Sequence, residues 1–386
     1  MSKIRIVLAH GALADYPEGG GHWMGYLQYL LGLDDLGHDV LWLEVMRSSG
    51  QGELDQARIQ SFFDRMAQYG FQDRCALLLH GEVAEPLTLE TAQGYGKTTE
   101  EIREFARSAD LVWNFCGTLR QPLLSLFKRR VFVDQDPGIL QISALSWDLA
   151  LNDHEVYLTA GTKLHAPDCE VPTLGLTWHP FLQFVYLPIW DIAPDPGPQA
   201  PFTSITQWTW EEIWWGQRVL SMTKRDAYLK YIDLPRRVSC RFELAANIHP
   251  EDSTGDRELL LNHGWHLSHP HQVAGSPTLY QQYIQHSRAE ICCPKPIYRD
   301  LKTGWFSERS ASYLASGRPV LAEDTGLSEV LPTGDGLLAF NDLEEAMAGA
   351  SEINAHYQRH MRCAREFAEQ YLGSRRCLTA MLAHCG

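Results

Sequence analysis

Residues 304–326 read GWFSERSASYLASGRPVLAEDTG and predict a loop, a helix, a short strand and a second loop. Ser307 is a typical N-cap residue before the helix-forming run 308–315, and Gly317 suits the left-handed turn that ends a helix. The apolar run 319–322 predicts the strand. Open α/β sheets bind phosphorylated ligands where a helix N-terminus lies beside the carboxyl end of a strand. The stretch therefore indicates such a sheet, with a ligand site at its edge.

Several groups at the start of this helix are able to bind an anion. They are the free backbone N–H groups that follow Ser307, the hydroxyls of Ser307 and Ser310, and the guanidinium of Arg309. Together they predict a diphosphate site. The alternative is an ordinary capped helix without a ligand, which the same residues also satisfy.

The stretch also resembles the donor-sugar-nucleotide motif in the C-terminal domain of GT-B glycosyltransferases, where a helix ends near A-x-G-x-P-V and a strand leads to D-x-G. The matching residues are Ala315, Gly317, Pro319, Val320, Asp324 and Gly326. Retaining members often carry two glutamates eight positions apart, where this chain has Gly304 and Ser312, with Glu308 one helical turn away. The resemblance implies nucleotide-sugar binding and leaves the stereochemical outcome open. It implies donor contacts by Ser307, Glu308, Arg309, Ser310, Asp324, Thr325 and Gly326.

A second nucleotide-type unit begins the chain. Residues 3–9 predict a buried parallel strand, residues 22–36 a helix and residues 39–45 another strand. Glycines before a helix let the backbone approach a phosphate closely, so we expect Gly20 and Gly21 to contact the donor. The ending LDDLGHDVLWLE resembles the L-x-x-L-G-H-x-V that closes the first helix of many GT-B enzymes.

Length and periodicity divide the chain into two domains. Its 386 residues are too many for one typical core. Alternating strands and helices predict two Rossmann-like domains, at 1–187 and 202–365. The resemblance implies that the first binds the acceptor and the second binds the donor. The proline-rich stretch 188–201 predicts the linker, and by the resemblance the terminal helix 366–386 packs back on the first domain. We therefore expect an α/β fold of two Rossmann-like domains facing across a cleft, the GT-B architecture.

Strands are expected near 3–9, 39–45, 75–79, 110–115, 130–134 and 156–160, and then near 202–206, 238–245, 264–267, 289–293 and 319–322. Composition is ordinary for a soluble globular protein, with 45% apolar and 21% charged residues. No apolar run is long enough to span a bilayer, no signal peptide is recognisable, and the odd number of cysteines, nine, includes no CxxC pair. These features predict a cytoplasmic protein with reduced thiols.

The formal net charge of −15 bears on the acceptor. Non-specific nucleic-acid binding requires clustered Lys and Arg, and the basic runs of this chain are short. We therefore do not expect a nucleic-acid acceptor, although a local basic groove is compatible with an acidic protein.

His22 follows the glycines directly and is the first candidate for a catalytic base. An imidazole of near-neutral pKa suits deprotonation of an acceptor hydroxyl. GGGH resembles the glycine–histidine of inverting GT-B enzymes, although the proline that usually follows is Gly25 here. The alternative is a histidine that only packs or caps at a helix start. His10, at the end of the first strand, is a second candidate.

The motif DQDPG, which begins at Asp134, ends a strand and starts a helix. Asp136 is either the N-cap of that helix or a cleft residue that binds the acceptor or orients a base, and Asp134 shares the second possibility. We assign Asp136 as a candidate catalytic residue. The DxD likeness does not predict a metal site, because GT-B enzymes usually handle phosphates with helix dipoles and basic side chains.

Lys224 opens a predicted helix, where GT-B enzymes commonly place a lysine on the donor diphosphate. A solvated helix end is the alternative reading. Lys295 is a further cation expected to face the cleft. The four histidines from His263 to His271 lack the i, i+4 spacing of a catalytic zinc site, so we expect no metal and no cofactor beyond the sugar nucleotide.

Six tryptophans cluster around the predicted linker, and indole faces stack on sugar rings or nucleobases. We expect most of them in interdomain packing and one or two in the cleft. They are Trp178, Trp190, Trp208, Trp210, Trp214 and Trp215.

The sequence thus predicts a glycosyltransferase that moves a sugar from a nucleoside diphosphate sugar, such as a UDP-sugar, to a small-molecule or peptide acceptor. Two alternatives stay open. One is a sugar-nucleotide epimerase of the same fold, and the other is a non-catalytic sugar- or nucleotide-binding protein.

Overall fold

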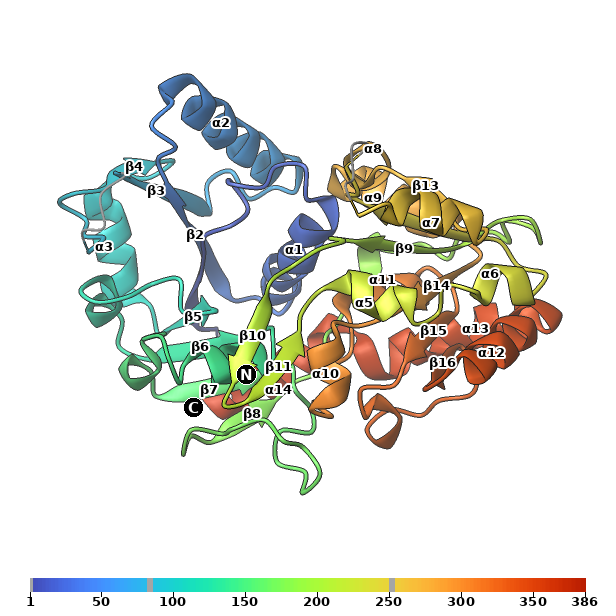
Figure 1. The fold of residues 1–386 in the computed structure, drawn as a ribbon. Coiled ribbons are helices and arrows are strands. Elements are labelled where there is room, and N and C mark those ends of the chain that lie inside the picture. Colours follow the sequence, from blue (N-terminus) through green and yellow to red (C-terminus); the bar gives the residue numbers. More distant parts are fainter. Residues whose placement is uncertain (1–2, 82–85, 250–253) are drawn as a thin grey trace.

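The runs of aliphatic and β-branched residues form two separate sheets in the computed structural model, which describes residues 3–81, 86–249 and 254–386 (Figure 1). Over these residues the first sheet has the strand order β4-β3-β2-β1-β5-β6-β7-β8, and its neighbours are parallel except β3 and β4. Its strands are β1 (Arg5–His10), β2 (Asp39–Arg47), β3 (Cys75–His80), β4 (Gln93–Tyr95), β5 (Leu111–Phe115), β6 (Arg130–Asp134), β7 (Val156–Thr159) and β8 (Trp178–Pro180).

The second sheet is parallel throughout, with the order β13-β12-β9-β14-β15-β16 in the described chain. Its strands are β9 (Phe202–Thr206), β12 (Phe242–Ala246), β13 (His266–Ser268), β14 (Ala289–Cys292), β15 (Val320–Glu323) and β16 (Leu337–Phe340). The central strands of both sheets are buried almost without a break, as expected where helices cover both faces. A small antiparallel hairpin of β10 (Glu212–Trp215) and β11 (Arg218–Ser221) lies outside both sheets.

Helices cover both sheets. In the first domain they are α1 (Gly20–Asp35), α2 (Gly52–Gln68), α3 (Thr99–Ser108) and α4 (Ile139–Ser143). In the second they are α5 (Lys224–Leu229), α6 (Leu234–Arg237), α7 (Asp256–Asn262), α8 (Pro270–Ala274), α9 (Pro277–His286), α10 (Pro296–Asp300), α11 (Glu308–Ala315), α12 (Leu343–Ala355) and α13 (Tyr357–Phe367). None of the helices in the described ranges is both long enough and apolar enough to cross a membrane.

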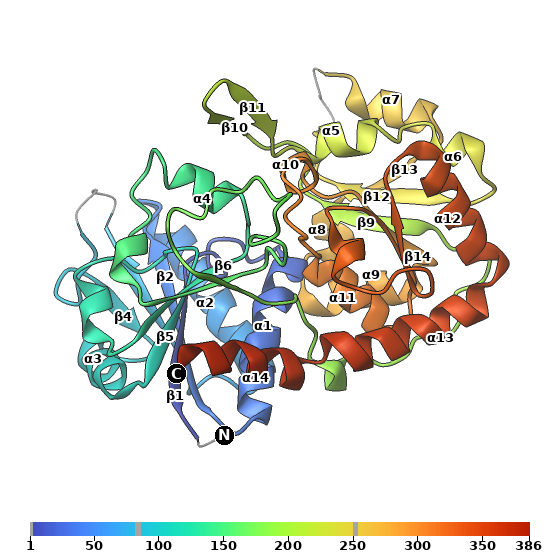
Figure 2. The ribbon, with the colours of Figure 1, turned by 90° about the horizontal axis from the view of Figure 1, so that it is seen from below.

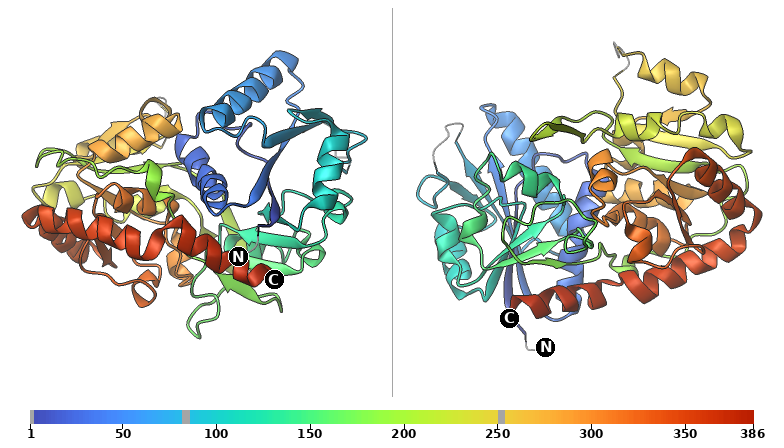
Figure 3. Two further views of the ribbon diagram at one scale, coloured as in Figure 1. Left: turned by 180° about the vertical axis from the view of Figure 1, so that it is seen from behind. Right: turned by 60° about the horizontal axis from the view of Figure 1, so that its bottom comes forward.

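The chain ends by returning to the first domain. After α13, one π-helical turn, η5 (Ala368–Leu372), leads into α14 (Ser374–Cys385), which packs against α1 and β7. Leu378 and Met381 on this helix are buried, and Arg375 forms an ion pair with Asp35. Figures 2 and 3 show these helices running from the second domain to the first, where both chain ends lie.

The structure confirms the α/β class with two parallel sheets and refines the predicted elements. Helix α1 begins two residues before the predicted helix, so Gly20 and Gly21 lie in its first turn and not in a loop. Strands β4, β8 and β16 and the hairpin β10–β11 were not among the predicted strands. Strands β4 and β8 have three residues each and lie at the sheet edges, so their pairing depends on a neighbour more than on their own sequence.

In each sheet the strand order reverses beside the strand that comes first in the sequence. The reversal lies between β1 and β5 in the first sheet and between β9 and β14 in the second. Ligands of open α/β folds bind outside the carboxyl ends of the strands at this position. Here β1 ends at His10 and β9 at Thr206, and the loops that follow bring the two domains together.

Candidate functional site

Two adjoining pockets lie between the domains, with volumes of about 250 Å³ and 620 Å³. Both are lined by Gly21, His22, Lys295, Glu308 and Arg309, so they form one continuous cleft. The first also contains Gly25, Tyr26, Tyr29, Gln135, Asp136, Gln183, Lys224, Tyr298, Trp305 and Ser307. The second extends past Tyr16, Gly20, Ile205, Trp210, His271 and Tyr280. Clefts of this combined size hold drug-sized ligands.

The N-terminus of α11 opens into this cleft. Ser307 caps the helix as predicted, because its hydroxyl oxygen accepts the backbone N–H of Arg309 at 3.2 Å. Glu308 and Arg309 follow in the first turn and line both pockets. Ser310 is buried behind them and lines only a small internal void. The helix therefore directs its positive end and two charged side chains towards a ligand in the cleft.

Arg309 is held by the sheet beneath it. Its Nε donates to Oε1 of Glu290 at 2.6 Å, and its Nη1 donates to the carbonyl of Ile205 at 2.7 Å. Burial acts to lower the pKa of the guanidinium, but the Glu290 carboxylate, together with weaker contributions from Cys292 and nearby tyrosines, holds the pKa above its ordinary value. Arg309 thus stays cationic at the cleft wall, with part of its hydrogen-bonding capacity committed to a buried ion pair that the sequence did not reveal.

Lys224 and Lys295 add two cations to the first pocket. Lys224, the first residue of α5, donates from Nζ to the carbonyl of Cys293 at 2.6 Å. Because it is buried, its pKa is lowered to about 8. Lys295 donates from Nζ to Oδ1 of Asp136 at 2.8 Å. The second domain therefore presents three cationic side chains to the pocket.

Asp136 joins the two domains. It follows β6, and its carboxylate accepts hydrogen bonds from Lys295 and from the hydroxyl of Tyr298 in the second domain. Burial acts to raise the pKa of this carboxyl, but Lys295 brings it below its ordinary value. The N-cap of α4 is Gly138, so the interpretation of Asp136 as a helix cap is wrong. Asp134, which lines neither pocket, is buried among Gln141 and Thr159.

His22 faces these cations from the first domain. Its Nε2 is buried and has no hydrogen-bond partner among the described residues. Burial lowers its pKa to about 4, although Asp136 acts in the opposite direction. The imidazole is therefore neutral at pH 7. His10 packs behind it, with ring centroids 5.5 Å apart, and does not line the cleft.

Packing between the domains also requires glycines at the start of α1. A Cβ atom on Gly20 would lie 2.3 Å from the carbonyl oxygens of Ala274 and Ser276, and one on Gly21 would lie 2.8 Å from the ring of Tyr280. These atoms belong to the second domain. Gly20 and Gly21 line the cleft, but they also let the two domains approach each other closely.

The segment after β15 is placed differently from the rest of the predicted donor site. Asp324, Thr325 and Gly326 line neither cleft pocket. Asp324 accepts the backbone N–H of Gly326 at 2.8 Å, and the Thr325 hydroxyl donates to the carbonyl of Trp305 at 2.7 Å. They form a turn that supports the loop before α11.

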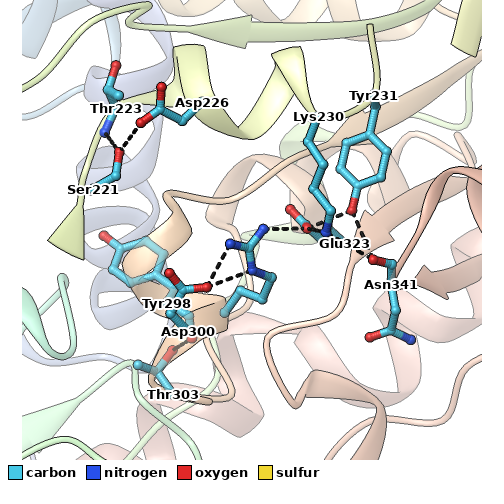
Figure 4. Close-up of polar contacts among 11 residues, drawn as sticks. Ser221, Thr223, Asp226, Lys230, Tyr231, Tyr298, Asp300, Thr303, Glu323 and Asn341 are labelled. Carbon is cyan, nitrogen blue, oxygen red and sulfur yellow. Dashed lines mark hydrogen bonds and ion pairs between the residues drawn. The ribbon is translucent and has the colours of Figure 1, made fainter. Parts of the chain in front are cut away.

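Glu323, the last residue of β15, is fixed by side chains of the second domain (Figure 4). Its Oε1 accepts hydrogen bonds from Lys230 at 2.8 Å, Tyr231 at 2.6 Å and Arg299 at 2.9 Å. This cluster anchors the carboxyl end of β15 beside α10, which carries Tyr298 into the cleft.

Several cleft residues were not singled out from the sequence. Tyr26 and Tyr29 lie four and seven positions after His22, on the same face of α1, and helical spacing was the available signal. Gln135 donates to the Tyr29 hydroxyl at 2.8 Å, and Gln183 donates to Gln135 at 2.7 Å. This wall of hydroxyl and amide groups suits a polyhydroxylated ligand.

The histidine segment and the tryptophans are dispersed in the structure. His263 contacts Asp233 and His271 contacts Tyr16, and the described residues include no group of three or more His, Cys, Asp or Glu able to hold a metal ion. Of the six tryptophans, Trp178, Trp190 and Trp208 are buried and Trp210 lines the cleft.

Comparison with known proteins gives structural matches without sequence matches. No protein-family model and no curated protein sequence matches the chain. Among solved structures, an alpha-glucosyltransferase in complex with UDP-glucose and DNA containing an abasic site is similar over 99% of both chains, with a TM-score of 0.61 and 12% identity. HepE from Anabaena in complex with UDP and glucose matches at a TM-score of 0.57 and 12% identity over 98% of this chain and 99% of its own.

Sucrose-phosphate synthase from Thermosynechococcus elongatus matches at a TM-score of 0.55 and 11% identity, over 98% of this chain and 97% of its own. These likenesses extend over nearly the whole chain and confirm the predicted GT-B architecture. Because one of the similar structures contains DNA, they lend no support to the expectation, based on net charge, that the acceptor is not a nucleic acid.

Proposed function

We propose that this protein is a glycosyltransferase that uses a nucleoside diphosphate sugar as donor. The observation that carries the proposal is the composition of the first pocket. Lys224, Lys295 and Arg309 bring positive charge to the N-terminus of α11, and a neutral His22 faces them from the other domain. Diphosphates are bound by helix N-termini and cationic side chains, whereas deprotonation of an acceptor hydroxyl requires an unprotonated base.

In the proposed reaction, an oxygen of the acceptor hydroxyl forms a bond to the anomeric carbon of the donor. The bond from that carbon to the diphosphate oxygen breaks, and its electron pair leaves with the nucleoside diphosphate. Lys224, Lys295 and Arg309 stabilise the negative charge that develops there. In an inverting reaction His22 takes up the hydroxyl proton, whereas in a retaining reaction the leaving diphosphate does so.

Structural similarity supports the donor class, because the similar alpha-glucosyltransferase and HepE structures contain UDP-glucose and UDP. Charge in the cleft supports binding without a metal ion. Lys224 faces the first pocket beside Lys295 and Arg309, which keep donors for a ligand in addition to their ion pairs with Asp136 and Glu290. We expect EDTA to leave donor binding unchanged. The anomeric configuration of the product, read by NMR, assigns the stereochemical outcome.

Thermal unfolding against UDP, GDP, ADP and their glucose conjugates tests the donor site. A ligand at about 100 times its Kd stabilises the folded state by about 2.7 kcal/mol, which raises the unfolding midpoint. We expect one nucleotide to do so, and Lys224→Met to abolish the shift. Lys128→Met is the matched control, because Lys128 is exposed and lines neither cleft pocket. The absence of a shift with every nucleotide at millimolar concentration would refute the proposal.

A further inference from the structure

The hairpin β10–β11 extends from the second domain towards the first (Figure 2). It is inserted between β9 and α5, and β10 packs against α4 of the first domain. Ile213 and Trp215 are partly buried against the core of the first domain. Trp214 points to the opposite face of the strand, where it is paired with Val219 and 68% exposed.

Trp210, just before the hairpin, connects this outer face with the cleft. It is 58% exposed and lines the second pocket. It also lines a shallow hollow of about 350 Å³ with Thr209 and Glu211. The Nζ of Lys295, which belongs to both cleft pockets, lies 5.8 Å from the centroid of the Trp210 ring. Trp210 is thus the point at which the cleft opens onto the hairpin.

Two acidic residues lie between these tryptophans in the sequence. Glu211 and Glu212 are exposed, and neither forms an ion pair in the part of the chain that the structure describes. An indole face next to free carboxylates matches a pyranose ring, whose C–H face packs on the indole while its hydroxyls donate to the carboxylates. The same carboxylates repel a phosphodiester backbone, so a single-stranded nucleic acid fits the surface less well.

On the basis of the function proposed above, we propose that the acceptor is an oligosaccharide, and that its sugar rings beyond the cleft stack on Trp210 and Trp214. The two tryptophans are four positions apart in the chain, a distance of at most about 13 Å when extended, which is enough for a short run of sugar rings. The hairpin is then an acceptor platform that continues the cleft, and it selects a neutral sugar chain by its aromatic and acidic side chains.

Saturation-transfer NMR of the full chain with five probes tests this assignment: cellohexaose, maltohexaose, laminarihexaose, chitohexaose and mannohexaose. We expect at least one to bind, and its Kd to rise about tenfold or more in Trp210→Ala/Trp214→Ala. Trp210→Phe/Trp214→Phe is the matched control, because phenylalanine keeps an aromatic face, and it is expected to retain most of the affinity. The single-stranded oligonucleotide dT12 is the competing probe and is expected not to bind.

The proposal is overturned if no hexasaccharide binds, if the double alanine variant binds as well as the parent, or if dT12 binds and the alanine variant abolishes that binding. Thermal stabilisation by UDP, GDP and ADP is measured on the same samples. Stabilisation by a nucleotide without any sugar binding overturns the acceptor platform alone. Sugar binding that depends on the tryptophans, without stabilisation by any nucleotide, overturns the donor site and leaves the platform supported.

Discussion

At the scale of single residues, Lys224 controls how the cleft responds to pH. Its pKa is lowered to about 8 by burial, so it is charged at pH 7 and loses its proton as the pH rises through 8. Only the charged form attracts a diphosphate. We therefore expect nucleotide affinity to be constant between about pH 6.5 and 7.5 and to fall by up to about tenfold per pH unit above 8. Calorimetric titration with UDP over this range measures it.

Lys224→Arg provides the control for this pH dependence. A guanidinium stays charged throughout the range, so the variant is expected to lose the decline above pH 8. Lys224→Met is expected to bind weakly at every pH. A parent protein whose affinity does not change between pH 7 and 9.5 would show that Lys224 does not hold the diphosphate.

His22 gives a second prediction at this scale. Burial lowers its pKa to about 4, so its imidazole stays neutral between pH 5.5 and 8. We expect its Cε1–H NMR signal to keep a constant chemical shift over this range. The signal is assigned by its loss in His22→Gln. A midpoint near 6.5, the ordinary value for histidine, would contradict the described burial of the ring.

The pair Arg309–Glu290 gives a prediction about stability. Glu290 has no exposed side-chain surface, so Arg309→Ala leaves a buried carboxylate without its cation. We expect a loss of about 3–5 kcal/mol in the free energy of unfolding, seen as a lower thermal midpoint. The variant Arg309→Met/Glu290→Met removes both charges and is expected to recover much of this loss. If the double variant were as unstable as the sum of its single variants, the ion pair would not couple the two sites.

At the scale of elements, helix α1 shows how closely the domains meet. A Cβ atom on Gly20 would lie 2.3 Å from two backbone oxygens of the second domain, whereas one on Gly25 would have the Cγ of Glu308 as its nearest atom, at 3.6 Å. We expect Gly20→Ala to cost about 1–3 kcal/mol through overpacking. Gly25→Ala, on the same helix, is expected to be neutral or to stabilise by up to about 1 kcal/mol. Equal midpoints for the two variants in thermal unfolding would argue against this contact.

The central strands could be predicted because each is a short aliphatic run bounded by turn residues, a pattern that the chain carries locally. The capped helix α11 is equally local, since Ser307 and the residues of its first turn are adjacent in sequence. The edge strands β4 and β8 and the hairpin could not be found in this way. Strands β4 and β8 pair with a neighbour in the sheet, and the hairpin packs against α4, so each depends on a contact that only the folded chain provides.

In the candidate site, too, features that are local in the sequence could be predicted and contacts between distant residues could not. His22, Lys224 and Arg309, which were chosen from the sequence, line one pocket, because strand carboxyl ends and helix N-termini define its edge. The sequence did not reveal that Arg309 contacts Glu290, or that Asp324 turns away from the cleft, because these contacts depend on side-chain geometry. Interdomain packing at Gly20 was likewise hidden, since its contact atoms lie some 250 residues further along the chain.

At the scale of the whole molecule, a loop of the first domain holds the loop between α10 and α11 in place. The Thr162 hydroxyl donates to the carbonyl of Gly304 at 2.6 Å, and the backbone N–H of Lys163 donates to that of Thr303 at 3.0 Å. The side chain of Lys163 is only 4% exposed, and its Nζ lies 2.7 Å from Oε1 of Glu329 in the second domain. Because residues of α10 and α11 both line the cleft, we expect this contact to couple the closure of the domains to the shape of the proposed donor site.

Charge reversal tests that coupling. In the parent protein Lys163 forms ion pairs with Asp168 and Glu329. Lys163→Glu replaces them with repulsion between like charges, so we expect the domains to move apart. We expect a larger radius of gyration in solution scattering and nucleotide affinity about fivefold weaker, equivalent to roughly 1 kcal/mol. Lys163→Glu/Glu329→Lys restores one ion pair and is expected to recover compactness and affinity together. If affinity fell in Lys163→Glu while the scattering curve stayed unchanged, the contact would shape the donor site locally and would not hold the domains closed.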